Sequence, residues 1–190
     1  MKASLRIAQD PVADEVLSTD PFGLVVGMLL DQQFPMERAF AGPAKLLERF
    51  GSLDPAIIAV ADPEEFATLC ATPPAIHRYG RSMAGRIQAL AAVVVETFSG
   101  DAERIWTEAS SGIDLLARLN ALPGFGEQKA RIFAALLGKQ LGVRPEGWAD
   151  AIGPYAETGS YRSVADVVGP ESLDKVRAYK KDARAAAKKA

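Results

Sequence analysis

A short turn with two glycines, set between two helical stretches, is the feature that most constrains the fold of this 190-residue chain. The turn reads Leu122-Pro123-Gly124-Phe125-Gly126 and separates a predicted helix at 112–120 from another at 127–140. Glycine tolerates positive φ and leaves the neighbouring backbone amides uncovered. Those amides, together with the positive end of the second helix, would form an anion site suited to a phosphodiester.

A plain connection between two helices is the alternative interpretation of this turn, because glycine is common in such connections. We favour the phosphate site because an apolar residue precedes Pro-Gly, Phe125 separates the glycines, and Ala130 follows four residues later. The segment therefore predicts contact with DNA. Phe125 itself is expected to be wedged between the two hairpin helices.

Charge is unevenly distributed along a chain whose formal net charge is only −2. Residues 172–190 contain seven lysines and arginines and two aspartates, and residues 75–90 contain Arg78, Arg81 and Arg86 with no carboxylate. Local basic faces on a mildly acidic protein suit one directed contact with a nucleic acid. A solvated, alanine-rich helix end is an equally good explanation of the C-terminal run.

Metal and disulfide chemistry is restricted by the presence of one cysteine, Cys70, and one histidine, His77. A single cysteine excludes an intrachain disulfide and a four-cysteine zinc or iron–sulfur site. We therefore expect no metal site in side chains, and we expect His77 to contact a phosphate or make a structural hydrogen bond. No charged-then-apolar leader or membrane-length apolar run is evident. We expect a cytoplasmic monomer, associated with the nucleoid if bacterial.

Four Asp-Pro pairs mark predicted helix starts, at residues 10, 20, 54 and 62. Aspartate accepts a hydrogen bond from the free amides of a first turn, and proline suits the first helical position. Residues 21–33 are strongly apolar and predict a buried central helix, and Ser82 is expected to cap a longer helix to Phe98. Short helices are expected at 35–41, 43–49 and 101–108. The sequence predicts an all-α protein with ten to thirteen helices.

The hairpin, in an all-α chain of this size, resembles the helix-hairpin-helix base-excision DNA glycosylase superfamily, the relatives of endonuclease III. The segments 20–33 and 77–87 also match that family, and the resemblance covers roughly residues 20–155. It implies a two-lobed helical fold in a small member without the iron–sulfur cluster. One lobe would be residues 20–138, with the hairpin motif at 112–140, and the other would combine 1–19 with 141–190.

The resemblance further implies a double-stranded DNA partner and a glutamine that fills the gap left by a flipped base, here Gln33 with Gln32 beside it. Hairpin carbonyls in relatives often hold a monovalent cation that bridges to the DNA phosphate. The expected DNA-binding residues are Gln32, Gln33, His77, Arg78, Arg81, Leu122, Pro123, Gly124, Phe125, Gly126 and Lys129.

Bifunctional relatives carry a nucleophilic lysine two residues after the second hairpin glycine, where this chain has Gln128. An amide cannot form the Schiff base that strand cleavage requires. Lys129 lies one residue later, rotated by about 100° on a helix, and is expected to face solvent or a phosphate. Gln128 therefore argues against lyase activity.

Monofunctional relatives use a carboxylate after the second hairpin helix, which stabilises the sugar cation as the base leaves. Asp150 is the aspartate in that stretch, with Glu146 as a weaker substitute, although Asp150 could instead serve only the first turn of a short helix. Trp148 and Tyr155 flank Asp150 and could stack on an extruded base. Both aromatics could equally be core anchors.

The sequence therefore predicts a monofunctional DNA glycosylase that hydrolyses the N-glycosidic bond of a damaged or mispaired base. A catalytically inactive DNA- or lesion-binding module of the same fold is the first alternative. A helical protein whose hairpin binds a protein partner, or nothing, is a more distant one.

Overall fold

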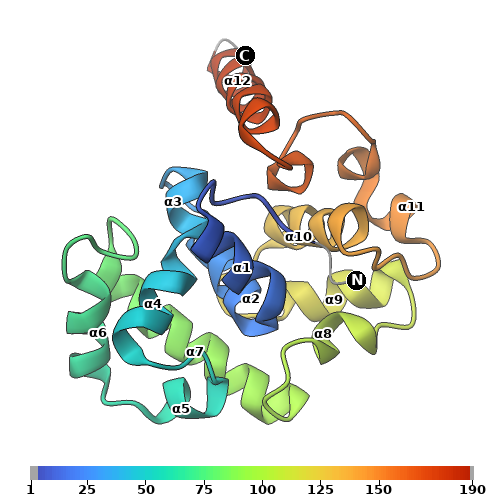
Figure 1. Ribbon diagram of the computed structural model, residues 1–190. Helices are drawn as coiled ribbons and strands as arrows, with labels where there is room; N and C mark the ends of the chain where they lie inside the picture. The colour runs from blue at the N-terminus through green and yellow to red at the C-terminus, as the bar shows by residue number, and fades with distance from the viewer. Residues whose placement is uncertain (1–3, 189–190) are drawn as a thin grey trace.

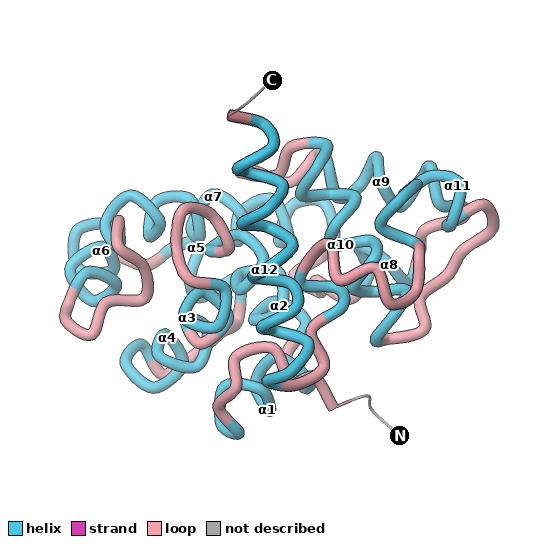
Figure 2. The backbone as a smooth tube through the Cα atoms, turned by 90° about the horizontal axis from the view of Figure 1, so that it is seen from above, coloured by secondary structure: helices cyan, strands magenta, loops and turns pink. Residues whose placement is uncertain are grey.

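The computed structural model describes residues 4–188 and shows twelve α-helices and two short 3-10 helices, with no β-strand in that range. Figures 1 and 2 show these helices as a body from which the last helix projects. The all-α prediction and the expected number of helices are confirmed. The helices are α1 (Pro11–Thr19), α2 (Pro21–Leu30), α3 (Met36–Phe40), α4 (Gly42–Phe50), α5 (Pro55–Val60), α6 (Pro63–Ala71), α7 (Gly80–Phe98), α8 (Arg104–Thr107), α9 (Gly112–Asn120), α10 (Glu127–Gln140), α11 (Trp148–Ile152), η1 (Gly153–Ala156), η2 (Val164–Asp166) and α12 (Pro170–Ala187).

The four Asp-Pro pairs begin helices as predicted. The carboxylates of Asp10, Asp20, Asp54 and Asp62 each accept a backbone N–H from the first turn, at 2.6–3.0 Å. The expected cap at Ser82 is wrong, because α7 begins two residues earlier, at Gly80. Gly80 packs so closely on α6 that an added Cβ would lie 2.7 Å from the Cys70 carbonyl oxygen. This close packing of α7 on α6 holds the two residues before Ser82 in the helix.

The centre of the molecule is α2, in which every residue after Pro21 is buried. It is packed by α1, α3 and α4, and one continuous apolar core extends from Leu5 to Val176. The helix ends at Leu30, three residues before the predicted end at Gln33, so Gln32 and Gln33 both lie in the loop that follows. No helix within residues 4–188 combines the length and apolar character needed to cross a membrane.

The position of α1 bears on the predicted division of the chain into lobes. We expected residues 1–19 to join the C-terminal segment, but α1 packs on α2, α3 and α4. Gly27 of α2 makes this possible, because the Leu17 side chain would lie 3.2 Å from a Cβ at that position. Residues of the 4–10 segment and of α1 line one cleft together with Pro170. The division into lobes stays a prediction.

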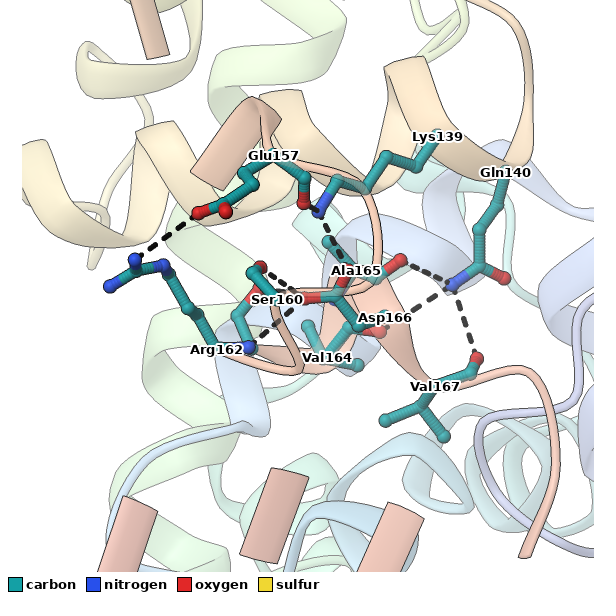
Figure 3. A network of polar contacts seen from close by, with 10 residues as sticks. Lys139, Gln140, Glu157, Ser160, Arg162, Val164, Ala165, Asp166 and Val167 are labelled. Carbon is teal, nitrogen blue, oxygen red and sulfur yellow. Dashed lines mark hydrogen bonds and ion pairs between the residues drawn. The ribbon is translucent and has the colours of Figure 1, made fainter. Parts of the chain in front are cut away.

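The segment between η1 and α12 is held to α10 by a polar network (Figure 3). The Lys139 ammonium donates to a carboxylate oxygen of Asp166 at 2.6 Å and to the Glu157 carbonyl at 2.7 Å. The Gln140 amide donates to the carbonyls of Ala165 and Val167 at 3.0 and 3.1 Å. This network fixes the loop from which α12 starts.

Candidate nucleic-acid interface

The hairpin consists of α9, the two-glycine turn and α10, with the bounds predicted from the sequence. Gly124 has φ +82°, and an added Cβ would lie 2.5 Å from Leu29 Cδ1. Leu122 and Phe125 are buried, and the Phe125 ring lies 6.1 Å from the ring of Phe133 on α10. The turn is therefore docked on the last turn of α2 rather than standing free.

The second glycine of the turn, Gly126, keeps the helix N-terminus open. Its backbone is extended, with φ −101°, so of the two glycines only Gly124 uses the positive φ that glycine allows. An added Cβ there would meet no atom within 4 Å, and no side chain caps the helix. The first amides of α10 have no acceptor within the helix and lie at its positive end. The turn thus has the geometry of an anion site.

We predicted that Lys129 would face solvent or a phosphate. In the structure its side chain instead points inward, to α2. Its ammonium donates to the carbonyls of Met28 at 2.6 Å, Asp31 at 3.1 Å and Leu29 at 3.4 Å. It therefore caps the C-terminal end of α2, where cations are favoured. Burial lowers the pKa of Lys129 to about 8.

We predict that Lys129 makes stability depend on pH above 8. Between the folded pKa of about 8 and the ordinary value of 10.5, the unfolded chain binds more protons. The free energy of unfolding should therefore rise with pH, by at most about 1.4 kcal/mol per unit. Urea denaturation at pH 7, 8, 9 and 10 should show this rise in wild type and a smaller one in Lys129→Met. Lys181→Met, on an exposed lysine, is the control, and equal slopes in wild type and Lys129→Met would contradict the assignment.

Gln32 is held rigidly in the loop after α2. Its carbonyl accepts from His77 Nε2 at 2.9 Å, its side-chain oxygen accepts from Arg86 at 3.1 Å, and its side-chain nitrogen donates to Leu29 at 2.7 Å. With all these groups engaged, Gln32 positions the loop. The neighbouring Gln33 is exposed and has φ +51°, which costs about 1–2 kcal/mol for a residue other than glycine. Backbone strain of this kind is concentrated at functional sites.

His77 makes the structural hydrogen bond, the second of its two predicted roles. The Tyr79 amide donates to Nδ1 at 3.1 Å, so Nε2 carries the proton that is donated to Gln32. The ring is 1 % exposed, and burial lowers the pKa of His77. A neutral, buried imidazole does not contact a phosphate.

The three arginines of residues 75–90 make different contacts. Arg81 forms an exposed ion pair with Glu64 between α7 and α6, and its contact with DNA stays a prediction. Arg78 stacks on Tyr79, with its guanidinium carbon 4.8 Å from the ring centroid, and remains exposed. Arg86 acts through Gln32, as described above.

Two clefts lie on either side of α12. The first, here the Gln33 cleft, measures about 620 Å³ and lies between the 31–37 segment and the basic residues of α12. The second, here the Tyr155 cleft, measures about 500 Å³ and contains Gln128, Tyr155, Arg162 and Tyr179. The Gln128 amide donates to the Tyr155 hydroxyl at 3.1 Å. The residue at the family's lysine position thus faces an aromatic-lined cleft.

Trp148 is a core residue and does not line the Tyr155 cleft. It is 7 % exposed, its indole nitrogen donates to the Ala134 carbonyl at 2.9 Å, and its ring packs on Gly138. The prediction that it stacks on an extruded base is wrong, because packing on α10 occupies the ring. Tyr155, by contrast, is half-buried in the cleft.

Neither of the two candidate carboxylates lines the Tyr155 cleft. Asp150 is exposed on α11 and is not among the residues that line the Tyr155 cleft. The Glu146 carbonyl accepts from the Gly112 amide at 2.7 Å, which places it at the start of α9, away from the turn. The catalytic role of either carboxylate stays a prediction.

Comparison with protein-family models matches residues 26–189 to the HhH-GPD superfamily, described as base excision DNA repair protein. The chain belongs to the HhH-GPD superfamily. The comparison with curated proteins gives no match. As a member of this superfamily the chain is a base-excision DNA repair protein and binds DNA, in agreement with the prediction from the hairpin.

In this HhH-GPD chain, the turn also provides backbone carbonyls for the predicted monovalent cation. The Leu122 carbonyl accepts from the Phe125 amide at 3.1 Å and keeps a second lone pair for a ligand bond. No group of three or more His, Cys, Asp and Glu side chains within residues 4–188 could hold a metal ion. The cation stays a prediction.

Sequence reasoning missed three features of this HhH-GPD interface: Arg162 and Tyr179 in the Tyr155 cleft, and α12 as a wall of both clefts. Arg162 donates to the Tyr179 hydroxyl at 2.9 Å and so connects the loop to α12. The basic C-terminal run was a signal for α12. No local pattern indicates that α12 lies beside Gln32 and Gln33.

Proposed function

We propose that the chain is a monofunctional DNA glycosylase that hydrolyses the N-glycosidic bond of a damaged or mispaired base and leaves an abasic site. The observation that carries this proposal is Gln128, which occupies the family's lysine position and bonds to Tyr155. The neighbouring amine, on Lys129, is held by carbonyls at the end of α2. Since lyase chemistry requires a free amine, these contacts favour hydrolysis without strand cleavage.

The DNA would be held by three parts of the interface. The open amides of α10 would bind a phosphate next to the damaged base. Gln33, exposed and held in place by its neighbour, would enter the gap in the duplex. The extruded base would lie in the Tyr155 cleft, where Tyr155 provides a stacking surface and Gln128 provides an amide for its polar edge.

A panel of duplexes tests the proposal. Substrates with uracil, hypoxanthine, alkylated purines and oxidised bases would be incubated with the protein, and abasic sites would then be cleaved with alkali. We expect alkali-dependent cleavage of at least one substrate, and its loss in Gln33→Ala while that variant remains folded. Cleavage without alkali, or a covalent adduct trapped by borohydride, would contradict the absence of lyase activity.

A catalytically inactive lesion-binding module is the second candidate. It is favoured by one observation, that the residues lining the Tyr155 cleft include no aspartate or glutamate. In that case lesion-containing duplexes would bind more tightly than intact ones, and no base would be released. If a base is released, full turnover by Asp150→Asn would show that Asp150 is not the catalytic carboxylate.

A further inference from the structure

We propose that α12 is a second DNA-binding element, which holds the phosphate backbone of one strand in the Gln33 cleft. This inference rests on the proposed function only in taking DNA as the partner. It concerns a helix outside the hairpin and requires no particular chemistry at the base. It is carried by the arrangement of charge on α12 and by the position of that helix beside Gln33.

Four basic residues of α12 and Lys188, which directly follows the helix, form one stripe. Arg177, Lys180, Lys181, Arg184 and Lys188 all line the Gln33 cleft. At about 100° per residue they project within an arc of about 100°, whereas Asp182 projects about 140° from Arg177. The stripe is about 16 Å long at 1.5 Å per residue. One DNA strand presents a phosphate every 3.4 Å of helix axis, so this length is matched to several phosphates.

The two halves of α12 differ in how their charges are paired. The first half is self-neutralised, with ion pairs Lys175–Glu171 at 2.7 Å and Arg177–Asp174 at 3.3 Å. Further along, no carboxylate within residues 4–188 lies within 4.0 Å of the basic groups of Lys180, Lys181, Arg184 or Lys188. If α12 were only a solvated helix, we would expect its second half to form intrahelical ion pairs as its first half does. Unpaired charges of one sign along one face are typical of a surface that binds a polyanion.

The composition of the stripe favours a nucleic acid over an acidic protein. Between Lys180 and Lys188 the uncharged residues of α12 are alanines, and all are exposed. Protein partners require apolar or aromatic anchors at the centre of an interface. Interfaces with DNA are more polar and far more positive than those between proteins. The surface therefore fits a phosphate backbone.

The base of α12 is fixed, which gives the stripe a defined direction. Leu173 and Val176 are buried, and Arg177 bonds to Glu37 of α3 at 2.6 Å. Beyond these contacts the helix projects from the body (Figure 1). Because Gln33 lines the same cleft as the stripe, a strand held by α12 would pass the residue that fills the gap in the duplex.

The test is the salt dependence of binding to an undamaged duplex by Lys181→Gln/Lys188→Gln. Loss of two phosphate contacts should lower the slope of log affinity against log salt by about two, at about 0.9 per contact. Lys175→Gln is the matched control, because Lys175 is on the same helix but pairs with Glu171, and it should leave the slope unchanged. Circular dichroism would verify that all variants are folded.

Each remaining outcome has one meaning. An unchanged slope in the double variant, with wild-type binding intact, would overturn the role of α12 and leave the proposed function standing. Salt-independent or absent binding by wild type would overturn both. Equal competition by heparin and by duplex DNA, lost together in the double variant, would show a general polyanion site and overturn the assignment to DNA.

Discussion

Replacing Asp166 with leucine is expected to lower the free energy of unfolding by about 3–5 kcal/mol, the largest effect on stability that we predict. The side chains of Asp166 and Lys139 are only 5 % and 9 % exposed, and their charged groups are 2.6 Å apart. Asp166 also accepts from the Arg162 amide at 3.1 Å. The substitution leaves a buried ammonium without its carboxylate and a backbone donor without its acceptor, and both are costly.

The double variant Lys139→Met/Asp166→Leu distinguishes a buried pair from a solvated one. Removing both charges should recover much of the loss, because apolar side chains of similar volume often replace a buried ion pair at little cost. Lys175→Met, which breaks an exposed pair on α12, is the control and should cost less than about 1 kcal/mol. Urea denaturation measures the free energy of unfolding of wild type, Asp166→Leu, the double variant and Lys175→Met. Single-variant losses below 1 kcal/mol would show that water screens the Lys139–Asp166 pair.

This pair connects stability to the candidate interface. The loop that it fixes carries Arg162, whose guanidinium donates to Tyr179 of α12 at 2.9 Å (Figure 3 shows the loop side of this connection). We therefore expect faster amide hydrogen exchange in residues 157–168 of Asp166→Leu. Loosening this loop would also remove one of the contacts that hold α12, so the salt-dependent part of DNA affinity should fall with it.

Local signals in the sequence predicted the helices well. An Asp-Pro pair sets a helix start through the side chain and backbone of neighbouring residues, so all four starts were found at Asp10, Asp20, Asp54 and Asp62. The hairpin bounds were also correct, because Ser111 caps α9 and the glycine turn separates α9 from α10. At Ser82 the same logic failed, since packing against α6 extended the helix beyond the local signal.

The direction of side chains in the site could not be predicted in this way. Lys129 bonds to residues about a hundred positions earlier in the chain, and Trp148 is held by Ala134 on α10. These partners exist only after helices distant in sequence have packed. The sequence singled out both residues, but burial decided their roles. Lys129 contacts backbone carbonyls of α2 and the following loop instead of solvent, and Trp148 packs on α10 instead of stacking on an extruded base.

The clefts depend even more on tertiary structure. The pairing of Gln128 with Tyr155 requires that η1 return to the N-terminus of α10. The Gln33 cleft requires that the last helix lie beside the end of the second. The sequence identified the basic run of α12 and indicated Gln33 as the residue that fills the gap left by a flipped base. Only the fold places that run and Gln33 on one surface.

Gly124→Ala is expected to lower the free energy of unfolding by about 2–5 kcal/mol and to abolish specific DNA binding. A left-handed backbone costs about 1–2 kcal/mol for alanine, and forced overpacking costs about 1–3 kcal/mol more. Both apply here, because Gly124 has φ +82° and the new methyl group would lie 2.5 Å from Leu29 Cδ1. Relief of this clash requires the buried Leu29 side chain to repack or the turn to move away from α2, and movement of the turn would carry the open amides of α10 with it.

Gly126→Ala separates the fold of the turn from its binding function. Gly126 has φ −101° and open space around its Cβ position, so alanine should change stability by less than about 0.5 kcal/mol. In the background Leu29→Ala, the cost of Gly124→Ala should shrink, because the atom that the methyl group meets is gone. Denaturant melts measure the free energy of unfolding of each variant, and duplex titrations measure its affinity for DNA. If Gly124→Ala proves no more costly than Gly126→Ala, then the turn is not docked on α2 as the structure shows, and its amides are positioned by some other part of the hairpin.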